Sequence, residues 1–166
     1  SMTKAIGCVA AMMLIDRGKL CMDTPVASIL PNWDELSVLN GWDGDLPVLR
    51  PPRVTATVRH LATHTSGLEY ELYNLDVSKY LKVTGYPPIL SGRKQALLSY
   101  PLTSDPGARW GYGIGVDWLG QVIEVLPWFV PVVALMIIPM FYAITWGVPL
   151  LNPGTVGILF MAEISI

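Results

Sequence analysis

The chain has 166 residues, which is enough for one ordinary domain with a hydrophobic core. Charged residues make up only 14% of the sequence and hydrophobic residues 52%, a balance between that of a soluble domain and that of a membrane protein. The net charge of -2 and the lack of a basic cluster exclude nucleic-acid binding as a function.

The chain opens with an apolar helix pattern that carries a candidate nucleophile. Apolar residues recur at spacings of three and four over residues 2–17, which predicts a largely buried helix, and Gly18 suits its C-terminal cap. Ser1 and Lys4 form a Ser-x-x-Lys element at the start of this helix. In a serine acyl-transfer enzyme the hydroxyl attacks a carbonyl, and a lysine one turn further on can help to remove its proton.

The two cysteines lie in and just after this first helix. Cys8 and Cys21 form no CxxC pair, and no histidine nearby completes a metal-binding spacing. We interpret them as small apolar side chains and expect neither a disulfide framework nor a metal site.

The next segments are predicted to be short helices and loops. Thr24 and Pro25 suit the start of a helix over residues 26–30 that Pro31 ends. Residues 40–52 are rich in glycine and proline and are predicted to be an irregular loop. Thr57 is expected to cap a helix over residues 58–64. The remaining predicted helices, the last of them amphipathic, cover residues 75–83, 92–99 and 116–126.

Residues 127–151 differ abruptly from the preceding sequence. The stretch carries no charge and exceeds the roughly 20 residues that a membrane-spanning helix needs. Trp128 and Trp146 lie near its two ends, as interfacial aromatic residues do. Two interpretations stay open, a membrane span or sequence that does not belong to the fold. A buried core helix is less favoured because no polar face remains.

Further residue patterns compete with Ser1 and Lys4 for a chemical role. Ser91 and Lys94 satisfy the same Ser-x-x-Lys pattern. His60 and His64 share a helix face, but no glutamate follows His60 and no third ligand is evident, so packed histidines are favoured over a metal site.

Ser66 and Tyr112 are two more candidates. Ser66 lies in Thr-Ser-Gly-Leu and not in the Gly-x-Ser-x-Gly turn that presents a nucleophile. Tyr112 is flanked by glycines, which places its phenol on an open loop before a helix, where a lysine cation can help it to act as a base. A turn with an aromatic anchor is the alternative interpretation of that loop.

Three blocks together resemble one known family. SMTKAIGCVAAMMLIDRGKL, TVRHLATHTSGL and DPGARWGYGIGVDWLGQVIE are similar, in order and spacing, to the serine β-lactamase-related family of class C β-lactamases, penicillin-binding carboxypeptidases and β-lactamase-like esterases. The resemblance implies that Ser1, and not Ser91, is the nucleophile and that Lys4 is its partner. It also implies that Tyr112 is the general base in acylation and the acid toward the leaving group.

The departures from the family pattern favour ester chemistry. Where class C β-lactamases have Tyr-x-Asn, this chain has Tyr112-Gly113-Ile114, which resembles the esterase branch. We therefore expect hydrolysis of carboxylic esters ahead of β-lactams, with a small-molecule ester or β-lactam as the substrate and no cofactor or metal. The rival hypothesis is a membrane-tethered, catalytically dead module of the same fold.

The resemblance also sets the expected fold and domains. It implies a mostly α fragment of the α+β serine β-lactamase/transpeptidase-like fold, truncated at both ends, which keeps the helical region and largely lacks the central antiparallel sheet. Residues 1–126 are expected to form a partial hydrolase domain and residues 127–166 an apolar tail.

The family's third motif is not found, because Trp146-Gly147 lies too close to Tyr112. Residues 1–166 alone are therefore expected to be inactive. The compartment is left open, with the cytoplasm favoured for the hydrolase part and membrane association expected only through residues 127–151.

Overall fold

The computed structural model describes residues 2–89 and 94–127, together with Pro131, Ala134, Leu135, Ile138 and Tyr142. Its helices and strands follow in this order: α1 (Met2–Asp16), the 3₁₀ helices η1 (Val26–Ser28) and η2 (Pro31–Glu35), β1 (Val38–Asp43), β2 (Leu46–Arg50), α2 (Val58–Ala62), α3 (Leu75–Thr84), α4 (Lys94–Ser99) and α5 (Gly115–Val125). Helices therefore dominate the described residues, as predicted.

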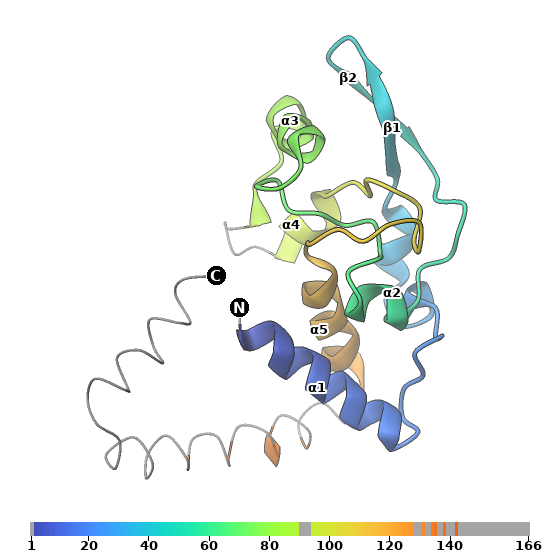
Figure 1. Ribbon diagram of the computed structural model, residues 1–166, viewed down its shortest axis with the longest axis vertical. Helices are drawn as coiled ribbons and strands as arrows, with labels where there is room; N and C mark the ends of the chain where they lie inside the picture. Colours follow the sequence, from blue (N-terminus) through green and yellow to red (C-terminus); the bar gives the residue numbers. More distant parts are fainter. Residues whose placement is uncertain are drawn as a thin grey trace, which may run out of the picture.

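Helix α5 is the centre of the packing, with α1 and α2 against it (Figure 1). Its inward face buries Trp118, Leu119, Val122 and Ile123, as the amphipathic spacing predicts. Helix α1 contributes Ala10, Ala11 and Leu14 to the same core. The two helices pack closely at Gly7, where an added Cβ would make an ordinary contact with Val116 at 3.7 Å.

The prediction that the first helix is largely buried is wrong for one of its faces. Ile6, Val9 and Met12 are exposed by 37%, 51% and 38%. The periodicity identifies the helix correctly, because apolar residues are regularly spaced along it. The same periodicity overestimates how much of the helix is buried, because apolar side chains occupy more of the helix surface than α5 and its neighbours cover.

The predicted irregular loop over residues 40–52 is also wrong, because β1 and β2 form an antiparallel hairpin there (Figure 1). Gly44 takes a left-handed backbone conformation in its tight turn. The pairing is irregular between Leu39 and Trp42, so the glycine in that interval, Gly41, marks a bulge and not a loop. Arg50 anchors the second strand through two hydrogen bonds of 2.9 and 2.8 Å to Asp105.

Helix α3 is confirmed within one residue of its predicted end and lies against this hairpin. Asn74 caps its start by accepting hydrogen bonds from the amides of Asp76 and Val77. Trp42 of β1 donates to Asp76 at 2.9 Å, and Lys79 lies 4.2 Å above the Trp42 ring. Hairpin and helix are therefore held to each other by polar contacts.

The other predicted elements differ in detail. Residues 26–28 are a 3₁₀ helix in which Pro25, and not Thr24, is the N-cap, and Pro31 begins a second 3₁₀ helix instead of simply ending the first. Thr57 is the N-cap of α2 as predicted, although α2 ends at Ala62. Within the described residues, no helix is both long enough and apolar enough to cross a bilayer. Most of the 127–151 stretch lies outside those residues, so its interpretation as a membrane span stays a prediction.

Candidate active site

Lys4 and Tyr112, predicted from distant parts of the sequence, lie close together in the structure. The Nζ atom of Lys4 is 5.5 Å from the centroid of the Tyr112 ring and 5.4 Å from that of Tyr70. Lys4 comes from the start of α1, and Tyr112 from the loop that leads into α5. The packing of α1 on α5 therefore determines their separation. The two candidate nucleophiles, Ser1 and Ser91, lie outside the described residues.

The surroundings of Lys4 keep it cationic. Burial acts to lower its pKa, but a hydrogen bond with Tyr70 and the charges of Tyr70, Tyr112 and Asp117 outweigh that effect and raise it. Burial also raises the pKa of Tyr70, whose hydroxyl donates to Asp117 at 3.4 Å. Tyr70 is thus a neutral phenol beside a lysine ammonium at neutral pH, and Lys4 acts as a fixed positive charge.

His64 forms one wall around the Tyr112 ring. Its ring centroid lies 5.0 Å from that of Tyr112, and its carbonyl accepts a hydrogen bond of 2.9 Å from the Gly111 amide. The backbone of His64 is left-handed, with φ at 57°, which is uncommon for a residue with a side chain. Burial and then the charge of Lys4 lower the pKa of His64, so its imidazole is neutral at pH 7.

The loop that carries Tyr112 is packed directly on the segment around Leu68. The Tyr112 carbonyl accepts a hydrogen bond of 3.2 Å from the Tyr70 amide. A Cβ on Gly113 would overlap the Leu68 carbonyl and lie 2.6 Å from the Cα atom of Glu69. The glycine that follows the tyrosine is therefore required for close backbone approach.

The other candidates of the sequence fall outside this cluster or lack access. Ser66 is only 1% exposed, which argues against attack on a substrate by its hydroxyl. His60 is occupied at Nδ1, which accepts a hydrogen bond of 3.1 Å from the Thr57 amide. Within the described part of the chain, no three His, Cys, Asp or Glu side chains are grouped so that they could hold a metal ion.

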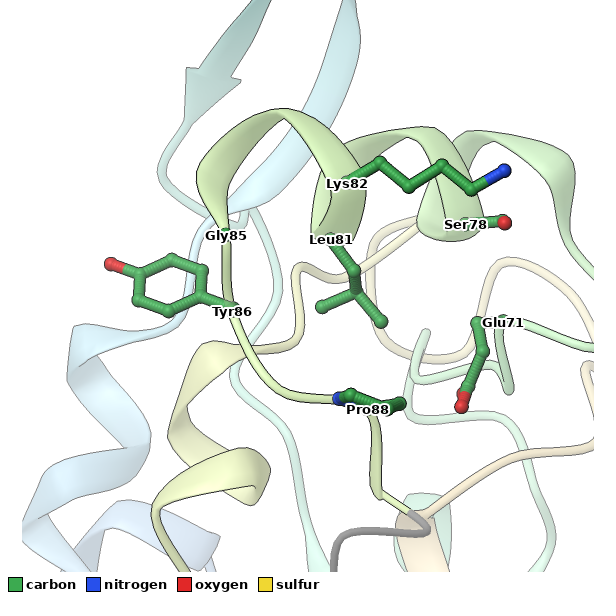
Figure 2. A pocket seen from close by; sticks show the side chains of 7 residues that line it. All are labelled: Glu71, Ser78, Leu81, Lys82, Gly85, Tyr86 and Pro88. Atoms are coloured by element: carbon green, nitrogen blue, oxygen red, sulfur yellow. The ribbon is translucent and has the colours of Figure 1, made fainter.

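A cavity of about 420 Å³ lies away from these residues, between α3 and the segment that follows it. Figure 2 shows Leu81 and Pro88 facing its interior, with Glu71 on the opposite side. The carboxylate of Glu71 is already engaged by the Tyr100 hydroxyl at 2.5 Å. Neither Lys4 nor Tyr112 lines this cavity, so we place the candidate site at the lysine and the tyrosines.

Sequence reasoning missed three residues at this site. The sequence indicates His64 only as a metal ligand or a packed histidine. Its contact with Tyr112 depends on a left-handed backbone conformation at His64, which no sequence pattern predicts. Tyr70 and Glu69 lie just beyond the second block of the family resemblance, which ends at Leu68. The only local signal there is a charged residue directly before a tyrosine, Glu69-Tyr70, and it is a weak one.

Comparison with known proteins identifies the family. The chain matches the Beta-lactamase family over residues 1–126. It is 36% identical over 127 residues to an acyltransferase, calJ, of Penicillium decumbens, and 34% identical over 126 residues to a lovastatin esterase of Penicillium rubens. Each alignment covers 75% of this chain. The chain therefore belongs to the beta-lactamase family.

Solved structures agree with that membership. Unliganded simvastatin synthase LovD from Aspergillus terreus is 34% identical and superposes with a TM-score of 0.67, covering 75% of this chain and 32% of that one. The chain spans 30% and 32% of the length of the two curated relatives. The described residues thus have the helical part of a β-lactamase-like fold together with one two-stranded sheet.

Proposed function

We propose that this chain carries the nucleophile helix and the proton-transfer tyrosine of a serine enzyme that cleaves carboxylic esters through an acyl-enzyme. The observation that supports this most directly is the lysine ammonium held over the rings of Tyr70 and Tyr112. Ser1 lies three residues before Lys4, so continuation of the α1 geometry would place both on one helix face.

The proposed reaction has two halves, acylation of Ser1 and deacylation, and Tyr112 accepts and returns one proton in each half. Oγ of Ser1 bonds to the ester carbonyl carbon while its proton passes to the oxygen of Tyr112, which enters this step as a phenolate and leaves it as a phenol. The ester C–O bond then breaks, and the departing alkoxide takes that proton from Tyr112. Water or an alcohol repeats these steps in reverse, which releases an acid or a new ester and restores Ser1.

Lys4 has an electrostatic part in this scheme. Because its pKa is raised, it stays protonated and stabilises the Tyr112 phenolate, both before it accepts the Ser1 proton and after it gives that proton to the leaving alkoxide. The relatives support both water and an alcohol as the acceptor of the acyl group, since one relative is named an esterase and another an acyltransferase. The departure at Gly113-Ile114 from Tyr-x-Asn places ester substrates ahead of β-lactams.

The decisive experiment compares two serines. In the chain extended by whatever its gene encodes on either side, Ser1→Ala should abolish hydrolysis of short-chain p-nitrophenyl esters and labelling by a fluorescent phosphonate. Ser91→Ala, the same substitution in the second Ser-x-x-Lys pattern, should leave both unchanged. Equal loss from both substitutions would overturn the assignment of Ser1.

The rival proposal, a membrane-tethered and catalytically inactive module, rests on the uncharged residues 127–151. It predicts that the extended protein resists the phosphonate and partitions with detergent or lipid through this stretch. Phosphonate labelling of the wild-type protein therefore separates the two proposals, because only an activated serine is acylated.

A further inference from the structure

Glu69 is a buried carboxylate directly behind the loop that carries Tyr112. Its side chain is 10% exposed, and it forms an ion pair with Arg109. Oε1 accepts a hydrogen bond of 2.7 Å from the Thr103 hydroxyl, and Oε2 one of 2.8 Å from the Asn74 amide. Burial of a charge is costly unless the charge is paired and hydrogen-bonded. Here Arg109 supplies the opposite charge, and Thr103 and Asn74 supply the hydrogen bonds.

The three partners of Glu69 come from separate segments. Arg109 lies on the loop that leads to Tyr112, and Thr103 lies in a bend directly after Leu102, which forms an isolated bridge with Val38. Asn74 also caps α3, because its Oδ1 atom accepts from two amides of the first turn. Glu69 therefore joins the tyrosine loop to α3 and to the bend at Thr103 at a single point.

Two glycines beside Tyr112 are packed against Glu69. A Cβ on Gly111 would lie 2.6 Å from Cγ and 2.8 Å from Cδ of Glu69, and one on Gly113 would lie 2.6 Å from its Cα. Neither glycine has a left-handed backbone conformation. Both are therefore needed for space and not for backbone freedom, and the Glu69 side chain fills the position that a side chain at residue 111 would take.

We propose that Glu69 is a positioning residue, which holds the Gly111–Gly113 backbone and thereby the Tyr112 phenol toward Lys4. This inference rests on the proposed function for its catalytic consequence. Its structural part, the interlocking of Glu69 with Gly111, can be measured without any activity.

The test of the structural part is a double-mutant cycle read by amide hydrogen exchange in the full chain. Glu69→Ala should speed exchange at the Gly111 and Gly113 amides by about tenfold, because it removes the packing and leaves Arg109 unpaired. The Val26 amide, which donates to Ala56 at 2.9 Å and involves none of the residues that contact Glu69, should be unaffected. Glu69→Gln keeps the shape of the side chain and should recover most of the protection.

Gly111→Ala supplies the second arm of the cycle. Alone it overlaps the Glu69 side chain and should speed exchange at Gly113 by about tenfold or more. In the double variant Glu69→Ala removes the overlap. Gly111→Ala should therefore increase the exchange rate at Gly113 at least several-fold less than it does in the wild-type background. Additive effects, or unchanged exchange at both glycines in Glu69→Ala, would overturn the inference.

The catalytic part is tested in the extended protein with p-nitrophenyl esters. Glu69→Ala should lower kcat by about 10- to 100-fold with KM little changed, because a misplaced phenol affects proton transfer and not substrate binding. Asp105→Asn is the matched control, since it breaks the ion pair of another largely buried carboxylate, with Arg50, and should leave kcat unchanged.

An active enzyme with normal kcat after Glu69→Ala would overturn the positioning role. Failure of the proposed function would appear separately, as full activity in Ser1→Ala, and would leave the exchange result standing.

Discussion

Replacement of Gly113 by alanine tests whether the tyrosine loop is as tightly packed as the structure indicates. The new Cβ would lie 2.6 Å from the Cα of Glu69, and it must move to about 3.4 Å for an ordinary contact. Because the obstacle is backbone and not a rotatable side chain, the loop itself has to shift. Overpacking of this kind costs about 3 kcal/mol, the upper end of the usual range.

Gly120 on α5 provides the matched control. A Cβ there meets nothing within 4 Å, and the residue lies inside a helix. Gly120→Ala should therefore stabilise the protein by about 1 kcal/mol through helix propensity alone. For a chain of this size each 1 kcal/mol corresponds to about 2–4 °C in Tm, so Gly113→Ala should lower Tm by about 6–12 °C and Gly120→Ala should raise it by about 2–4 °C.

Thermal unfolding followed by tryptophan fluorescence measures both variants in the same chain. Trp118 and Trp33 are suitable reporters because they are buried and their rings contact edge to face at 5.0 Å. If Gly113→Ala unfolds within about 2 °C of the wild type, the loop has room that the structure does not show, and the packing argument fails.

Three further predictions concern charge, proton transfer and the apolar stretch. Because the pKa of His64 is lowered from 6.5 in the folded state, the unfolded state binds the extra proton more readily, so Tm should fall as the pH drops below 6.5 and His64→Phe should weaken that dependence. In the extended enzyme, Tyr112→Phe should reduce ester turnover by about 100-fold or more with Tm nearly unchanged, and an unaltered rate would make Tyr112 a packing residue only. Deletion of residues 127–166 should improve solubility, measured by sedimentation, without creating activity, because it removes uncharged apolar sequence.

The helices could be predicted from the sequence because each has a local cause. The spacing of three and four that buries Trp118, Leu119 and Val122 is visible in the letters of α5, and Thr57 marks the start of α2. The hairpin was missed for an equally local reason. Gly44-Asp45, the two residues between the strands, is a hairpin-turn signal, but the surrounding glycines and prolines made the whole stretch resemble a loop.

The candidate site could be predicted only in part. Motif order in the sequence identified Lys4 and Tyr112, and the structure brings the two together. No sequence rule could find the contacts of Glu69, because Thr103 and Arg109 meet it only after folding. His64 is similar, since its contact with Tyr112 depends on a left-handed turn at the end of α2.

The packing of α1 on α5 also has a consequence for how the site forms during folding. Lys4 and Tyr112 stand near opposite ends of the described sequence, so their contact closes one of the longest loops in the chain. Closing such a loop loses conformational entropy before the stabilising contacts form, and contacts between distant segments therefore slow folding. The hairpin and α3 can form from nearby residues, whereas the lysine–tyrosine pair requires α1 to have docked. We therefore expect the pair to assemble late in folding, and any partly folded state without docked α1 lacks it.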